Sequence, residues 1–409
     1  MDAAGLSALL TPDGWALLEA LPPYREDAAM GLAERLRNEG VDPVLVAAAL
    51  TQSRLRARAE GKFGPFAAGM LFTVEGLAQA TRLEVAARHA QRFAAAGVER
   101  VADLGCGIGG DAMALAGLDR RVLAVDQDET TAAVATVNLR HWPEAQVLQA
   151  EATSVDLSGV DGAWLDPARR TASGRRVLDP HRASPPWDAV LGVARQVPAT
   201  GVKLAPGIPR DLAPPGAETQ WVSVDGDVVE AAVWFGPLAR PGLRASALVL
   251  RDGAAVEVDD AGMPAPHAVA GRDGVGTYLY DPDGAVVRSG LVGQVAALVS
   301  GRLLDPTIAY VTSDVLVRTP LARALVVEEV LPFGLKALRT RLRDRGVGRV
   351  EVLKRGSALD VEQLRRQLRL SGPNEASVVL TRIAGQQSVL LARPVARTAA
   401  GTDRSPGSA

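Results

Sequence analysis

The chain has 409 residues, enough for two or three domains of about 150 residues each. Apolar residues make up 47% of it and charged residues 22%, and the formal net charge of −2 excludes a uniformly basic nucleic-acid binder but not a locally basic one. The single cysteine, Cys106, excludes disulfides, thiolate zinc sites and iron–sulfur clusters, and four scattered histidines argue against a histidine site, so no metal is expected.

The first 20 residues contain no Lys or Arg, which argues against a secretory signal. No apolar run approaches the ~20 residues that a membrane-spanning helix needs. These patterns predict a cytoplasmic protein.

Residues 1–60 are predicted to form an N-terminal helical region, because apolar residues recur at three- and four-residue steps. A loop and a helix over about Leu83–Phe93 follow. Five apolar strands then alternate with helices, and the Asp225-Gly226 pair between two apolar runs predicts a tight hairpin. This order predicts a doubly wound parallel α/β sheet with antiparallel strands at one edge, within a domain over residues 61–240. The predicted strands are Val101–Leu104, Val122–Asp126, Val147–Ala150, Ala163–Asp166 and Val202–Leu204.

Residues 241–314 are predicted to be a strand-rich connecting region with Gly, Asp and Pro turns. From residue 315 the charge balance changes: residues 315–409 carry 17 Lys and Arg against 8 Asp and Glu. Helices over Phe333–Arg345 and Val361–Leu370, with a strand between them and a final hairpin, predict a small α/β domain over residues 315–394. The small, polar tail 395–409 is predicted to be disordered.

The strongest motif is the glycine-rich turn that leaves the strand Val101–Leu104 and enters a helix. Through Gly105, Gly107 and Gly110 it fits a dinucleotide fingerprint. Through Asp103 and glycines 105, 107 and 109 it fits S-adenosylmethionine, because a carboxylate attracts a cationic methyl donor and repels a pyrophosphate. A glycine turn without any ligand is the third reading.

Residues 101–110 resemble motif I of the class I S-adenosylmethionine-dependent methyltransferases. The resemblance implies a seven-stranded Rossmann-like sheet and this cofactor. It also implies that the carboxylate of Asp126 holds the ribose, that Glu151 reads the adenine, and that Gln127 belongs to the same cofactor site. The alternative for both acids is a solvated carboxylate at a strand end. The cofactor-binding residues expected so far are Asp103, Gly105, Gly107, Gly109, Asp126, Gln127 and Glu151.

The sequence Asp166-Pro167-Ala168-Arg169 resembles the acid-Pro-Pro-aromatic motif of methyltransferases that modify nitrogens. The resemblance implies catalytic roles for Asp166 and Pro167 in orienting the target amine. Alanine replaces the second proline and Arg169 replaces the aromatic residue, where a guanidinium can also stack on a base. The alternative is that Asp166 caps a turn and the arginine is solvated.

Residues 70–81 are placed like the segment that closes over the cofactor in trimethylguanosine-synthase-like enzymes. Thr73 is accordingly expected to contact the cofactor, or else to cap a helix. Cys106 lies within the cofactor loop, where it is not available to attack a pyrimidine, so C5 methylation is excluded. Direct displacement by a nitrogen or oxygen nucleophile remains.

The sequence from Leu331 to Pro394 resembles the THUMP-like domain of an uncharacterised group of methyltransferases. Domains of the THUMP type bind RNA, and basic residues recur along both predicted helices. The sequence therefore predicts an enzyme that methylates a nitrogen or oxygen of structured RNA, either tRNA or rRNA. The alternatives are a small-molecule or protein methyltransferase, and a non-catalytic RNA-binding protein that keeps bound S-adenosylmethionine.

Overall fold

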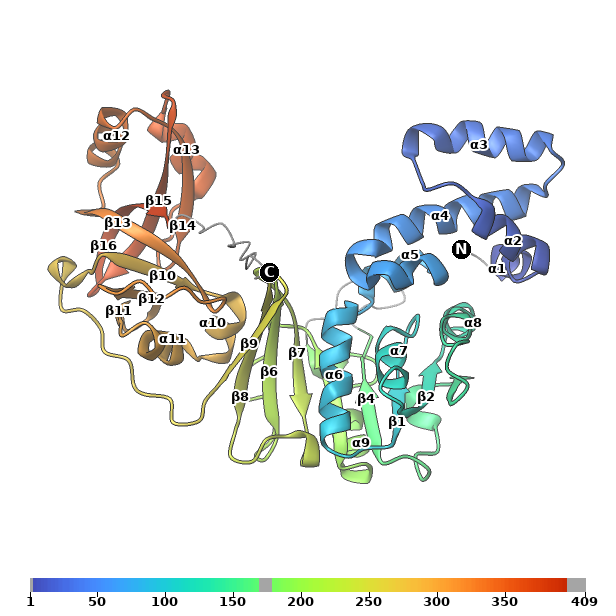
Figure 1. Cartoon of the computed structure of the whole chain (residues 1–409). Coiled ribbons are helices and arrows are strands. Elements are labelled where there is room, and N and C mark those ends of the chain that lie inside the picture. The colour runs from blue at the N-terminus through green and yellow to red at the C-terminus, as the bar shows by residue number, and fades with distance from the viewer. Residues whose placement is uncertain (1–2, 169–178, 396–409) are drawn as a thin grey trace, which may run out of the picture. The chain divides into compact units, whose positions relative to one another are not determined.

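The structure, a computed structural model, describes residues 3–168 and 179–395 (Figure 1). Of the sequence expectations, Arg169 and the tail from residue 396 lie outside this range. The chain divides into two compact units, one of residues 1–219 with 230–242 and one of residues 220–229 with 243–409. Within the described part of the chain, no helix combines the length and the apolar character required to cross a lipid bilayer.

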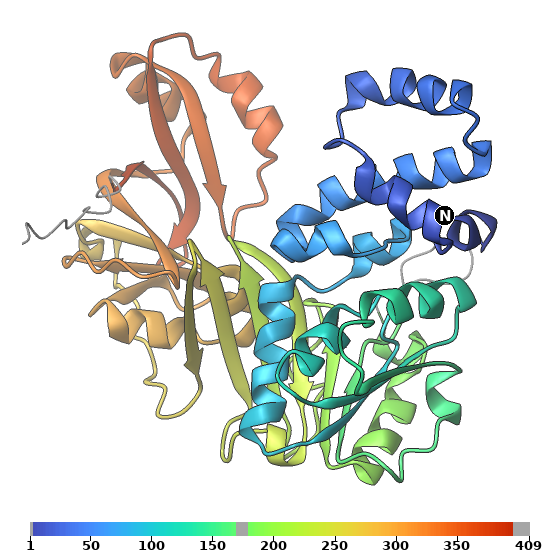
Figure 2. The same ribbon diagram turned by 45° about the vertical axis from the view of Figure 1, so that its right-hand side comes forward.

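The first unit begins with a helical region and continues into an α/β domain (Figures 1 and 2). Its helices are α1 (Ala3–Leu9), α2 (Pro12–Ala20), α3 (Glu26–Asn38), α4 (Pro43–Phe63), α5 (Val74–Gln79), α6 (Leu83–Ala95), α7 (Gly110–Ala116), α8 (Glu129–Asn138) and α9 (Trp187–Gln196), with 3-10 turns at Gly64–Gly69, Ala152–Ser154, Pro180–Arg182 and Gly236–Leu238. Its strands are β1 (Arg100–Leu104), β2 (Arg121–Asp126), β3 (Ala145–Gln149), β4 (Gly162–Leu165), β5 (Ala199–Leu204), the start of β6 (Glu218–Val224) and most of β7 (Asp227–Trp234).

The first sheet is larger than predicted. Strands β3-β2-β1-β4-β5 are parallel, as the alternating pattern predicts, and β7 pairs antiparallel with β5. The order continues through β6 to β8 (Ala245–Arg251) and β9 (Ala254–Asp259), giving nine strands where seven were expected. The two extra strands form an antiparallel hairpin, whose turn residues Asp252 and Gly253 both have positive φ, as tight hairpins require.

The second unit holds a separate seven-stranded sheet in the order β11-β12-β10-β13-β16-β15-β14. Its elements are β10 (Tyr278–Pro282), α10 (Gly284–Ser289), α11 (Val292–Leu298), β11 (Arg302–Asp305), β12 (Ile308–Ser313), β13 (Ala322–Pro332), α12 (Leu335–Asp344), β14 (Val347–Lys354), α13 (Val361–Leu368), β15 (Asn374–Ile383) and β16 (Gln386–Pro394), with a 3-10 turn at Arg272–Gly274. Strands β10 to β12, from the region predicted to be a connection, therefore share a sheet with the C-terminal strands. The helices α10 and α11 and the long strand β13 were not predicted.

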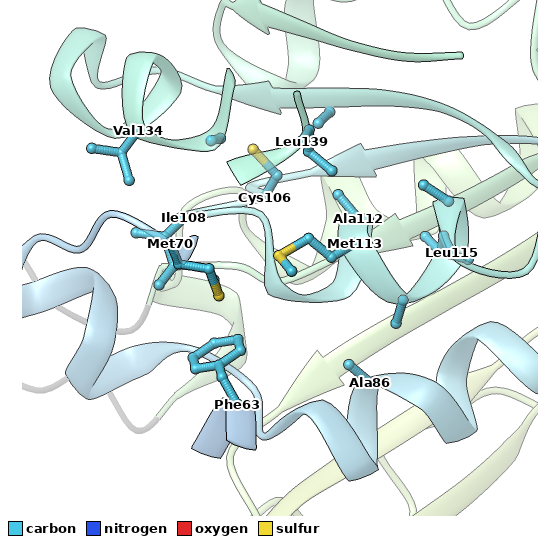
Figure 3. Packing of buried hydrophobic residues seen from close by; sticks show 14 of the residues in the cluster. Phe63, Met70, Ala86, Cys106, Ile108, Ala112, Met113, Leu115, Val134 and Leu139 are labelled. Carbon is cyan, nitrogen blue, oxygen red and sulfur yellow. The ribbon is translucent and has the colours of Figure 1, made fainter. Parts of the chain in front are cut away.

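One hydrophobic cluster links the helical region to the glycine-rich turn. Figure 3 shows Phe63 and Met70 packed with Ile108, Cys106 and Met113. All five side chains are buried. The glycine-rich turn therefore packs against the segment that precedes β1 as well as against the sheet.

Candidate functional site

The glycine-rich turn after β1 has a backbone that only glycine adopts without strain. Gly105, Gly107 and Gly109 have φ angles of 88°, 56° and 88°. A Cβ at Gly105 would lie 2.9 Å from the carbonyl oxygen of Asp166, which is closer than real Cβ contacts come. The ends of the neighbouring strands β1 and β4 therefore approach each other at this point.

A cavity of about 250 Å³ opens above the carboxyl ends of these strands, where open α/β sheets bind ligands. Asp103 and Gly109 are not among the residues that line it, whereas eight of the other expected site residues are. Those eight are Thr73, Gly105, Gly107, Asp126, Gln127, Glu151, Asp166 and Pro167.

Asp103 lies buried at the end of β1, with 1% of its surface exposed. Burial, and then the negative charges of Asp111 and Asp166, raise the pKa of Asp103 well above its usual range. Its Oδ2 has no hydrogen-bond partner within the described residues. A buried carboxyl oxygen without a partner is costly, and a cationic ligand group would compensate it. This orphaned oxygen fits the positively charged methyl donor that the motif implies.

Asp126 is the last residue of β2 and lines the same cavity. Its Oδ2 accepts a hydrogen bond from the Gly107 N–H at 3.1 Å, and its Oδ1 accepts one from the Asp128 N–H at 2.9 Å. Burial raises the pKa of Asp126. Asp126 therefore braces the glycine turn in addition to facing the cavity, while Glu151, after β3, is exposed.

Asp166 follows β4 and faces the cavity with its side chain one-quarter exposed. Its backbone N–H donates to the Leu104 carbonyl at 3.2 Å, which fixes it beside the turn. Its Oδ2 lies 2.7 Å from the Nζ of Lys203 on β5, whose side chain is 4% exposed. Asp166, which the motif predicts to orient the target amine, is thus held by a buried ion pair that the motif did not predict.

The ion pair belongs to a buried polar chain in the first unit. Lys203 Nζ donates to Thr81 Oγ1 at 2.9 Å, and Thr81 Oγ1 donates to Asp111 Oδ2 at 2.7 Å. The imidazole of His89 then lies between two carboxylates, with Nδ1 2.8 Å from Asp111 Oδ1 and Nε2 2.7 Å from Glu230 Oε1.

The balance of charges among these buried side chains explains why they stay ionised in the core. Burial alone lowers the pKa of His89, but the Glu230 and Asp111 carboxylates outweigh it and raise that pKa to about 9. Burial likewise lowers the pKa of Lys203, yet Asp166, Asp111 and Glu230 raise it above its usual value. The opposite signs alternate along the chain, as buried charges require.

Sequence reasoning missed His89, Lys203 and Glu230, because their partners lie 22 to 141 residues away. One signal was present: Lys203 is one of only four lysines, and it stands in a predicted buried strand. Within residues 3–168 and 179–395, no group of three His, Cys, Asp or Glu is arranged to hold a metal ion.

Residues 69–81, called the wall segment below, form one side of the cavity. Thr73 lines the cavity and also caps α5, because its Oγ1 accepts a hydrogen bond from the Gly76 N–H at 2.9 Å. Both readings of Thr73 are therefore compatible with the structure. A Cβ at Gly76 would lie 2.4 Å from Ile108 Cγ2, so α5 rests directly on the glycine-rich turn.

Many basic side chains of the second unit are already paired with groups of the same unit, so fewer are available to a ligand than its composition suggests. On α12, the basic residues include Arg339 and Arg343, which donate to the carbonyls of Gln367 and Arg369 at the end of α13. Several other arginines form ion pairs with glutamates, namely Arg323, Arg341, Arg345, Arg349, Arg365 and Arg393. Lys336 and Arg366 are exposed and show no ion pair among the described residues.

Comparisons with known proteins agree with this geometry. Residues 322–394 match the family described as THUMP domain-like, and residues 2–59 match a domain of unknown function, DUF8688. Uncharacterized S-adenosylmethionine-dependent methyltransferases from two strains of Mycobacterium tuberculosis, CDC 1551 and H37Rv, are 37% identical to the chain over 345 residues, covering 80% of it and 90% of each relative.

A crystal structure from Porphyromonas gingivalis W83, assigned to the methyltransferases, has the same fold. It superposes with a TM-score of 0.69 at 19% identity, covering 92% of this chain and all of the other. The sequence relatives identify the family. The cavity at the end of β1, and an Asp103 oxygen that has no partner among the described residues, are consistent with it. The chain belongs to the S-adenosylmethionine-dependent methyltransferases and carries a THUMP-like domain at its C-terminal end.

Proposed function

We propose that the chain methylates a nitrogen, or an oxygen, of structured RNA, either tRNA or rRNA, by direct displacement. When bound, S-adenosylmethionine supplies an electrophilic methyl group. The cofactor-binding residues in this proposal are Asp103, Thr73, Gly105, Gly107, Gly109, Asp126, Gln127 and Glu151. Asp103, just before the glycine turn in sequence, offers a buried carboxyl whose ionised form a cationic cofactor group would favour, and Asp126 and Glu151 offer acceptor oxygens to its hydroxyl and amino groups.

The observation that carries the proposal is the position of Asp166. Its carboxylate faces the cavity and is paired with Lys203, so it accepts hydrogen bonds and donates none. An amino group is the nucleophile that such an acceptor orients best, because its N–H donates while its lone pair stays free. Pro167 follows Asp166 and lines the cavity beside it, where the target amine would enter. Arg169, also expected there, lies outside the described residues.

The THUMP-like domain supports RNA as the substrate class, and Lys336 and Arg366 offer exposed cations for phosphates. The test is methyl transfer from labelled S-adenosylmethionine to total RNA, compared with total protein and small metabolites. We expect label in RNA, located by mass spectrometry of nucleosides. Label only in protein or metabolites would favour the alternative methyltransferases, and RNA binding without turnover would favour a non-catalytic role.

We expect Asp103→Asn to weaken S-adenosylmethionine binding by about tenfold or more, because an amide of the same shape cannot ionise beside the cationic cofactor. Isothermal calorimetry measures this directly. The exposed Asp119→Asn, in the loop after α7, is the matched control and should leave the affinity unchanged. Equal affinities for Asp103→Asn and the unaltered chain would contradict the assignment of Asp103.

A further inference from the structure

The wall segment lacks strand neighbours, yet its extended part is deeply buried. Leu71 and Phe72 are both 0% exposed, and they lie outside every sheet. Buried backbone groups need hydrogen-bond partners, so those of Leu71 and Phe72 must be satisfied by something other than a strand. The partners are side chains from two helices.

Helix α4 of the helical region supplies the first set. Gln52 is fully buried, and its amide makes a two-way contact with Phe72, accepting from the N–H at 2.9 Å and donating to the carbonyl at 2.7 Å. One turn later, Arg56 Nε donates to the Met70 carbonyl at 2.9 Å. The side chain of Gln52 thus replaces a neighbouring strand for Phe72.

The last turn of α4 holds the far end of the wall segment. Lys62 Nζ donates to the carbonyls of Leu77, Ala78 and Ala80, at 2.7, 3.1 and 3.0 Å. These carbonyls are at the C-terminal end of α5, where a cation is favourable to the helix dipole. Burial, and then the charges of Lys203 and Arg82, lower the pKa of Lys62 to about 8.

Helix α8 supplies the second set from the α/β domain. Asn138 makes the same two-way contact with Leu71, accepting at 2.8 Å and donating at 3.0 Å, and it also donates to the Ile108 carbonyl at 2.8 Å. Arg140 donates to the Gly69 carbonyl at 3.0 Å. Successive residues of the wall segment are therefore held alternately by the α/β domain and by the helical region.

We propose that the N-terminal helical region is a clamp for the cofactor cavity, in which Gln52, Arg56 and Lys62 are positioning residues for the wall segment. The role assigned to this region is cofactor retention, and not the recognition of a separate partner. The inference rests on the proposed cofactor site, because the wall segment carries Thr73, Glu75, Gln79 and Thr81 into that cavity.

The clamp has little tolerance for movement. Gly76 has no space for even a Cβ against Ile108, so α5 cannot shift toward the glycine-rich turn without a clash. Thr81, at the end of the wall segment, is bonded to both Asp111 and Lys203. A displacement of the wall segment therefore reaches the polar chain that holds Asp166.

The test uses the full-length protein and two variants, Gln52→Leu and Lys62→Met. Calorimetry with S-adenosylmethionine should show affinity lowered by about tenfold or more, because the wall is no longer fixed. Hydrogen exchange should be faster in peptides from residues 69–81, with the strand β5 peptides unchanged. Arg58→Gln, an exposed change on the same helix, is the control and should alter neither measurement.

Lys62→Arg, which keeps a cation at the end of α5, should restore most of the affinity lost in Lys62→Met. If Gln52→Leu fails to fold, the half-buried Lys62 series carries the test. Folded variants that bind S-adenosylmethionine as tightly as the unaltered chain would overturn the clamp, even if the wall segment exchanges faster. Loss of affinity in the variants, with no methyl transfer to RNA by the unaltered chain, would support the clamp and refute the RNA proposal.

Discussion

At the residue scale, the central feature is a set of alternating charges that are mostly buried. Lys203 pairs directly with Asp166, Thr81 bridges Lys203 to Asp111, and His89 joins Asp111 to Glu230. Such an arrangement stabilises the fold only while every member has its partner, because a single unpaired charge in the core is expensive. Its contribution is therefore visible when one member is removed or changes its protonation.

Lys203→Met should lower the free energy of unfolding by about 3–5 kcal/mol, because Asp166 and Asp111 lose their shared cation. Adding Asp166→Asn should recover part of this loss, since the remaining carboxylate has one negative neighbour fewer. Urea denaturation of the two single variants and the double variant gives the coupling energy. Strictly additive effects would show that the 2.7 Å pair carries no specific interaction.

His89 makes stability depend on pH. Its pKa in the folded chain is about 9 against 6.5 for an ordinary histidine, so its stabilising charge is fully present below pH 6.5. That contribution, on the order of 3 kcal/mol at most, is lost as the pH rises from 6.5 to 9. Over this pH range the melting temperature of the unaltered chain should fall, and that of His89→Gln should change less. The exposed His141→Gln is the control and should behave like the unaltered chain.

At the scale of elements, the approach of β1 and β4 decides the shape of the site. Gly105 directly follows β1 and has a positive φ, and a side chain there would collide with the Asp166 carbonyl oxygen at the end of β4. Gly105→Ala should cost about 1–3 kcal/mol of stability and displace Asp166. Melting temperature and calorimetry measure both effects, and Gly207→Ala, which has open space around it, should change neither.

The sequence predicted those elements that a local pattern of apolar and turn residues marks. Strands β1, β2 and β4 agree with the predicted ranges to within about two residues, because apolar runs and turn residues mark them locally. Helices α10 and α11 are too short, at six and seven residues, for a helical period to stand out. Strand β13, with 11 residues, carries Glu328 and Glu329 in its interior, which hid its apolar pattern.

The candidate site could be predicted only where a motif is contiguous in the sequence. Asp103, the glycines and Asp166 stand in short motifs, and the structure brings most of them to one cavity. The clamp residues and the buried polar chain depend on contacts between distant segments, such as Gln52 with Phe72 and His89 with Glu230. No local pattern encodes those contacts, since each side chain alone has an ordinary alternative.

At the scale of the whole molecule, charge is unevenly distributed, with a basic excess in residues 315–409. Much of that excess is paired within the second unit, so composition overstates the charge available to phosphates. Arg366→Ala should reduce the slope of the salt dependence of RNA binding by about one, because one phosphate contact is lost. Arg349→Ala, whose guanidinium is 2.7 Å from Glu375, should change the slope less. Filter binding over a range of salt concentrations distinguishes them.

The position of β7 has a consequence for how the protein is made. Strand β5 pairs with β7 on one side, and β7 brings Glu230 to His89. A nascent chain that ends before residue 230 therefore leaves β5 with an open edge and the histidine with one carboxylate. Vectorial synthesis cannot close this edge of the sheet until the hairpin after Val224 has left the ribosome, and until then the edge of β5 is open to pairing with other chains.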